Sequence, residues 1–201
     1  MRKTQIKEFF EAIRNRDLKT VTKFIVLDRD FLDVPNFAPP QKDDGQSALQ
    51  LAFKTSNFEI ANFLLEQGAD VNFMEQSELN AWRTPVLHDC IRATIFNSWT
   101  LQKETGKFDT AFALLQMMLS KGADPNAEDS YGNNCLNRAF MDAIQMINHP
   151  QDLKNEVLLT QLRSVFKELI IAGADIEKHS EKRLSFSKQI EHEKWRQYQF
   201  I

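Results

Sequence analysis

The stretch Leu64–Asn72, LLEQGADVN, ends a run of helix-forming residues with the tripeptide Gly-Ala-Asp. Nearly the same ending occurs twice more, as MLSKGADPN at Met118–Asn126 and as LIIAGADIE at Leu169–Glu177. In each copy the glycine follows an apolar pattern with helical spacing, and glycine readily adopts the left-handed conformation that ends a helix. The sequence therefore predicts three copies of one unit, each ending in the same helix stop.

The residues upstream of the first stop, 43–72, predict what that unit contains. Two apolar runs with helical spacing occupy residues 49–53 and 60–64. Between them, Ser56 and Asn57 supply a turn. The unit is therefore expected to be a helix, a turn and a second helix, followed by an extended link.

Three segments at the predicted helix starts resemble the ankyrin-repeat family, whose pattern there is Thr-Pro-Leu-His-x-Ala. They are SALQLA at Ser47–Ala52, TPVLHDC at Thr84–Cys90 and NCLNRA at Asn134–Ala139, and Phe9–Ile25 is similar more weakly. The resemblance implies an all-α, ankyrin-like solenoid of stacked helix-turn-helix repeats, with short hairpin fingers and terminal caps. The expected repeats are residues 4–36, 43–76, 83–127 and 131–177, with a C-terminal capping segment at 178–201.

The spacing departs from the family pattern in the third and fourth repeats. From the leucine that starts the first helix to the glycine stop, the chain runs 19 residues in the second repeat, 35 in the third and 37 in the fourth. Stacked repeats bury their faces on each other, so a long repeat needs a long neighbour. We therefore predict that both helices are lengthened in these two repeats. The alternative is that part of each insertion is a loop.

The overall composition limits the possible partners and the compartment. The 201 residues carry a formal net charge of -3, which favours neither nucleic acid nor an anionic membrane. No run of 18 apolar residues predicts a membrane span, and the N-terminal residues are charged too often for a signal peptide. Two cysteines, Cys90 and Cys135, are too few for a disulfide scaffold. These features predict a cytoplasmic monomer.

The residue types that carry chemistry show no catalytic or metal-binding spacing. His88 and Cys90 are two residues apart on one predicted helix, so their side chains point apart and cannot act as a nucleophile and its base. The other histidines lack the paired spacing of zinc ligands, and the six glycines form no phosphate-binding loop. The sequence predicts no enzyme activity and no cofactor.

The resemblance implies a concave groove, lined by the fingers and the first helices, in which ankyrin-like proteins bind partners. The first and second fingers are long and carry large apolar side chains, which favour an interface over exposure to water. Helical spacing marks the positions on the first helices that face the groove. The candidate partner-binding residues are Phe37, Leu51, Lys54, Phe73, Met74, Trp82, Asp89, Arg92, Arg138 and Met141. Basic residues outnumber acidic ones at the groove positions, which suggests a protein partner with an acidic, partly apolar patch.

These observations predict a non-enzymatic module for protein–protein interaction, with a partner that the sequence does not identify. One alternative is a stand-alone inhibitor, such as an immunity protein that neutralises a toxin or an enzyme. Another is a structural or self-associating unit, in which the apolar finger residues form a homodimer contact.

Overall fold

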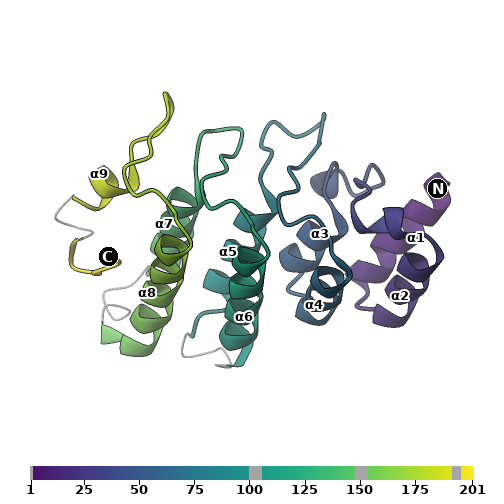
Figure 1. The fold of residues 1–201 in the computed structure, drawn as a ribbon, viewed down its shortest axis with the longest axis horizontal. Helices are drawn as coiled ribbons and strands as arrows, with labels where there is room; N and C mark the ends of the chain where they lie inside the picture. Colours follow the sequence, from purple (N-terminus) through teal and green to yellow (C-terminus); the bar gives the residue numbers. More distant parts are fainter. Residues whose placement is uncertain (1, 100–105, 148–153, 192–195) are drawn as a thin grey trace.

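The computed structural model describes residues 2–99, 106–147, 154–191 and 196–201. Within these residues the regular structure is helical, and the only extended pairings are isolated bridges such as Met74–Pro85. Four helix pairs lie side by side in chain order (Figure 1). The pairs are α1 (Lys3–Arg14) with α2 (Leu18–Leu27), α3 (Ala48–Lys54) with α4 (Phe58–Gln67), α5 (Val86–Phe96) with α6 (Gly106–Ser120), and α7 (Cys135–Met146) with α8 (Glu156–Ile171). The predicted all-α solenoid is confirmed.

The ends of the helices follow from their local sequence. Asp17, Asn57 and Asn155 begin the second helices of three pairs, and each side chain accepts a hydrogen bond from a backbone N–H in the first turn. The glycines of the three repeated stops have φ of 89°, 90° and 96°, which confirms the predicted left-handed conformation. The second helices α2, α4 and α8 thus begin at a side-chain cap, and in three repeats the second helix is followed by a glycine stop.

Helix length differs between the second pair and the two pairs that follow it. The helices α3 and α4 have 7 and 10 residues, whereas α5 and α6 have 11 and 15, and α7 and α8 have 12 and 16. The predicted lengthening is confirmed, and it occurs in neighbouring pairs because each must cover the apolar face of the other. The parts of the insertions at residues 100–105 and 148–153 lie outside the described residues.

The C-terminal end of the stack is covered by aromatic side chains. Phe186, at the start of the short helix α9 (Phe186–Ile190), stacks on Phe166 of α8 with ring centroids 5.3 Å apart. Phe200 contacts the same ring at 4.5 Å, and Tyr198 is also buried. The predicted capping segment is present, but its described helix has only five residues. Residues 192–195 of the expected capping segment lie outside the described residues.

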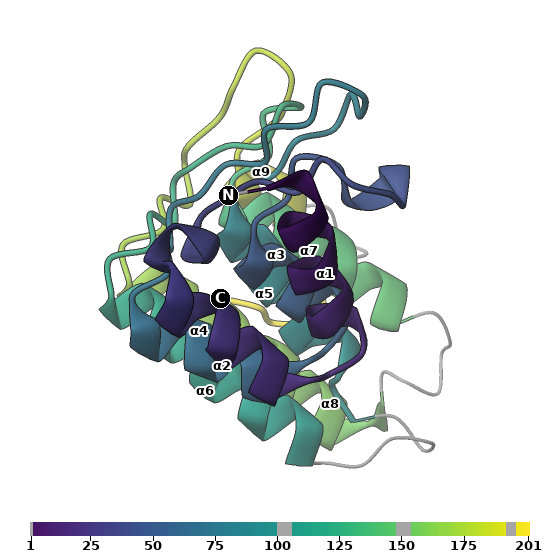
Figure 2. The ribbon, with the colours of Figure 1, turned by 90° about the vertical axis from the view of Figure 1, so that its right-hand side faces the viewer.

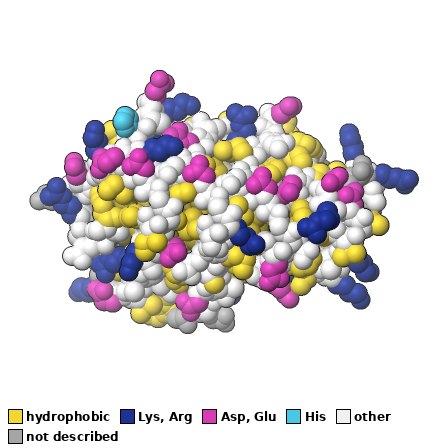
Figure 3. Space-filling model, viewed as in Figure 1, with side chains coloured by type: hydrophobic (Ala, Val, Ile, Leu, Met, Phe, Trp, Pro, Cys, Tyr) yellow, Lys and Arg dark blue, Asp and Glu magenta, His cyan; other side chains and the backbone are white. Residues whose placement is uncertain are grey.

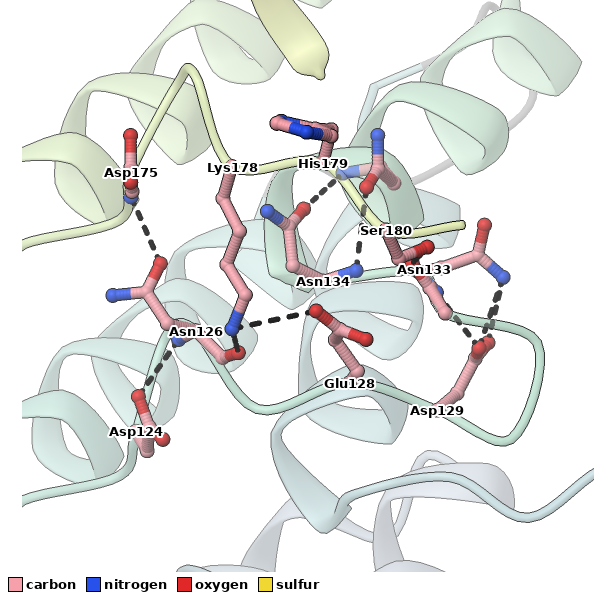
Figure 4. A network of polar contacts seen from close by, with 12 residues as sticks. Asp124, Asn126, Glu128, Asp129, Asn133, Asn134, Asp175, Lys178, His179 and Ser180 are labelled. Carbon is pink, nitrogen blue, oxygen red and sulfur yellow. Dashed lines mark hydrogen bonds and ion pairs between the residues drawn. The ribbon is translucent and has the colours of Figure 1, made fainter. Parts of the chain in front are cut away.

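Asparagines tie the links of successive repeats together. The Asn126 side chain donates to the carbonyl of Gly173 and accepts from the backbone N–H of Asp175, as Figure 4 shows in part. Asn72 makes the same two bonds one repeat earlier, to Gly122 and Asp124. These bonds fix the position of each link against the next, and so fix the angle at which neighbouring helix pairs stack.

The hairpins that follow each helix pair project as fingers from the same edge of the stack (Figure 2). We name them the first finger (residues 33–46), the second finger (71–85), the third finger (124–134) and the fourth finger (175–185). The two short 3-10 helices of the first link are η1 (Arg29–Leu32) and η2 (Gln41–Asp43). Neighbouring fingers are hydrogen-bonded: Gln76 N–H donates to Gly45, Arg83 N–H to Ser130, and the Ser180 hydroxyl to Gly132. The fingers therefore form a fixed row beside the first helices.

Candidate partner-binding groove

A pocket of about 470 Å³ opens between the helices α3 and α5 and the second finger. We call it the α3/α5 pocket. Its walls combine apolar, aromatic and charged side chains. The lining residues are Lys42, Gln46, Phe53, Lys54, Ser56, Glu75, Leu79, Asn80, Ala81, Trp82, Thr84, Asp89, Arg92, Ala93 and Phe96. It lies on the side where the resemblance placed the groove.

Four of the residues predicted from sequence meet in this pocket: Lys54, Trp82, Asp89 and Arg92. The guanidinium of Arg92 lies 5.2 Å from the centre of the Trp82 ring and 5.7 Å from that of Phe96. The Trp82 indole N–H donates to a carboxylate oxygen of Asp129 at 2.9 Å. The third finger thus fixes the tryptophan at the pocket wall, where its face stacks on an arginine.

The basic residues of the groove are paired with carboxylates. The carboxylate of Asp43, on the first finger, forms salt bridges with Arg14 at 3.0 Å and with Lys54 at 2.9 Å. The carboxylate of Asp142, on α7, forms salt bridges with Arg92 at 3.5 Å and with Arg138 at 2.5 Å. In each cluster one buried carboxylate joins first helices of neighbouring repeats. The basic excess that suggested an acidic partner is therefore engaged inside the protein.

Two acidic residues of the pocket, Glu75 and Asp89, are not paired with a base in this way. Glu75 and Asp89 are 5% and 8% exposed, and within the described residues neither has an ion-pair partner. Asp89 accepts a hydrogen bond from the Gln50 amide at 3.0 Å. Burial raises the pKa of Glu75 to about 7, with the nearby charge of Asp89 adding to the shift, and burial raises the pKa of Asp89 to about 6. The charge of Lys54 lowers the pKa of both groups, and Arg92 and Arg138 also lower that of Asp89, but none of these bases lies within ion-pair distance of either carboxyl group.

Three predicted site residues are buried in the protein instead. Leu51 is 1% exposed because the short helix α3 is covered by its neighbours α1, α4 and α5. Phe73 is 5% exposed because residues 71–78 alternate between buried and exposed, as an extended segment does, and Phe73 falls on the buried side. Arg138 is 6% exposed and bound to Asp142. These three side chains are thus buried in the protein, and none of them lines the α3/α5 pocket.

The other predicted residues lie outside the pocket lining. Phe37 on the first finger is 61% exposed, Met74 on the second is 39% exposed, and Met141 on α7 is half-buried. Leu79, also 61% exposed, lines the pocket. Leu79 is one of the large apolar residues of the long second finger, but it was not among the ten partner-binding residues predicted from the sequence.

Sequence reasoning missed Glu75, Asp43 and Asp142, which set the charge of the groove. In a sequence they look like ordinary solvated carboxylates. For Glu75 one signal was available: it shares the buried register of Val71, Phe73 and Ser77 in the alternating segment 71–78. Asp43 and Asp142 carry no such signal, since each pairs with an arginine from another repeat, Arg14 and Arg92 respectively.

The thiols show no sign of reactive surroundings. Cys90 and Cys135 are free and fully buried, and burial raises the pKa of both. Among residues 2–99, 106–147, 154–191 and 196–201, no three His, Cys, Asp or Glu side chains gather closely enough to hold a metal ion. In the same ranges, no helix has the length and apolar character needed to span a membrane.

The face of the stack turned toward the viewer in Figure 3 carries side chains of both charges. Acidic and basic side chains are interspersed over it, with hydrophobic ones between them. Such mixing is the usual state of a solvated surface.

Comparison with known families agrees with this architecture. The ankyrin-repeat model matches residues 44–75, which contain α3, α4 and the link after them. A search of curated proteins found no match to the chain. The predicted resemblance is confirmed over these residues: the chain contains an ankyrin repeat and stacks its helix pairs as an ankyrin-like solenoid.

Proposed function

We propose that this protein is a non-enzymatic module that binds a partner protein through the α3/α5 pocket and the fingers beside it. Ankyrin repeats are in general protein–protein interaction modules. The observation that carries the proposal is the pocket itself, where a half-buried tryptophan, an arginine and an exposed leucine line the same cavity as two buried carboxyl groups. Tryptophan and arginine dominate the binding energy of many interfaces.

The rigidity of this surface supports the proposal. Trp82 and Arg83 on the second finger are bonded to Asp129 and Ser130 on the third, and Asn80 donates to Gln41 on the first. A surface that is already ordered loses little conformational entropy when a partner binds. The location in the cytoplasm and the monomeric state stay predictions.

The proposal is tested with two matched leucines on different fingers. Leu79 and Leu184 are 61% and 62% exposed, but only Leu79 lines the α3/α5 pocket. The partner is first captured from native cells with tagged wild-type protein and identified by mass spectrometry. Its purified form is then titrated against Leu79→Arg and Leu184→Arg by calorimetry. Because arginine at position 79 obstructs the pocket mouth, we expect at least a tenfold loss of affinity, against less than threefold for the control.

A second variant probes the wall of the pocket. Trp82→Ala removes the ring over which Arg92 lies, and we expect it also to weaken binding at least tenfold. Circular dichroism checks that each variant keeps its helical content. Wild-type affinity in the folded Leu79→Arg variant would contradict the proposal.

A further inference from the structure

The acidic groups of the α3/α5 pocket come from two different elements. Glu75 lies on the second finger and Asp89 on the first turn of α5, and both line the same cavity. The charge of Asp89 adds to the raised pKa of Glu75, so the two carboxyl groups act on each other. Two acidic side chains from different elements therefore line one open pocket.

Two of the three bases that line this pocket, Lys54 and Arg92, are engaged elsewhere. Lys54 lies 2.9 Å from Asp43 and also donates to the carbonyl of Lys42 and the side chain of Gln46. Arg92 contacts Asp142 and lies between two aromatic rings. The third base of the lining, Lys42, is exposed at the rim.

An incoming acidic group and an incoming basic group would meet different surroundings here. An acid would face Glu75 and Asp89, and it would compete with Asp43 and Asp142 for their lysine and arginine. A base would meet two buried carboxyl groups without an ion pair, and pairing relieves the cost of a buried charge. Charge complementarity favours the base.

We propose that the α3/α5 pocket receives one basic side chain, an arginine or a lysine, of the bound protein. Its charged end contacts Glu75 and Asp89, and its methylene groups pack against Leu79 and Ala81 at the mouth. This inference rests on the proposed function, because it names the chemistry of the group that the groove binds.

The test uses capped pentapeptides, acetyl-Gly-Ala-X-Ala-Gly-amide, in which X is arginine, lysine, citrulline or glutamate. Binding at pH 7.5 is followed by the ¹H–¹⁵N signal of the Trp82 indole, which is assigned with Trp82→Phe. We expect saturable shifts with arginine and lysine and at least tenfold weaker binding of citrulline, which has nearly the shape of arginine without its charge. Equal binding of citrulline, tighter binding of glutamate, or no saturable shift with arginine and lysine would overturn the inference.

Variants identify the acids. Glu75→Gln combined with Asp89→Asn keeps the side-chain shapes and is expected to weaken the arginine peptide at least tenfold. The control, Glu78→Gln, removes an exposed acid from the same finger and is expected to change binding less than twofold. An unchanged affinity in the folded double variant would also overturn the inference.

Failure of this inference is distinguishable from failure of the proposed function. If Leu79→Arg abolishes capture of the natural partner while the double variant captures it at wild-type strength, the proposed function holds and only the inference of a bound basic side chain fails. If Leu79→Arg still captures the partner, the groove itself is the wrong surface.

Discussion

Asp89 and Asp142 lie on neighbouring first helices, α5 and α7, and both are buried, yet their surroundings differ. Asp142 is fully buried and contacts two arginines, one from its own helix and one from α5. Asp89 has one amide partner, Gln50, and borders an open pocket. A buried carboxylate that is paired inside the protein stabilises the stack, whereas we propose that one without an ion pair is available to a ligand. The difference separates the structural part of the groove from the part that we propose binds a partner.

The largest effect on stability is expected from removing the charge of Asp142, the acid that is paired with arginines. Asp142→Asn leaves Arg138 buried without its carboxylate, which should cost about 3–5 kcal/mol of unfolding free energy. Asp89→Asn, the matched change, should cost less than about 1 kcal/mol at pH 7.5, because it removes no ion pair and relieves the burial of a charge. Urea unfolding followed by circular dichroism measures both. Similar losses in the two variants would remove the distinction between the paired and the unpaired acid.

The next effect concerns the contact between the first and second fingers beside the pocket. Gly45 has φ of 75°, and a Cβ atom there would lie 2.0 Å from the backbone nitrogen of Ser77. Gly45→Ala should therefore cost about 2–4 kcal/mol and displace the second finger. Gly122→Ala is the control, since Gly122 has a similar φ of 90° but open space around it, and it should cost about 1–2 kcal/mol. Equal losses would show that the close approach of the fingers contributes nothing.

The fold was largely predictable from the sequence. The Gly-Ala-Asp stops mark where helices end, and the matched insertions follow from the need of each repeat for a neighbour of equal length. The pocket was predictable only in part. Lys54, Trp82, Asp89 and Arg92 were found because helical spacing and finger length mark them. Phe73 was assigned to the wrong side because aromatic character was weighed above the alternation of its segment. Which acids are paired depends on contacts between repeats, and these have no trace in a single sequence.

The smallest effect is a pH dependence that belongs to the pocket. The pKa of Glu75 is raised to about 7, so between pH 4.5 and 7 the folded state holds more protons than the unfolded state. Its contribution to stability is therefore present at low pH and is lost as the pH rises through 7. The Glu75→Gln variant has no carboxyl group to titrate at this position and does not lose this contribution. Its free energy of unfolding minus that of the wild type should therefore increase by about 1–2 kcal/mol from pH 5 to pH 8.

This change is measured as the difference between the two urea midpoints at each pH, so that titration of other groups common to both proteins cancels. Lys54 and Asp89 also act on the charge of Glu75, the first lowering its pKa and the second raising it. A difference that stays constant between pH 5 and pH 8 would show that Glu75 is not held in a desolvated position.

Hydrogen–deuterium exchange of the protein with and without its purified partner tests the central claim most directly. The account predicts slower exchange in the complex at residues 74–84 of the second finger and in the first turns of α5. Protection confined to α4, α6 and α8, with unchanged exchange at the second finger, would contradict it.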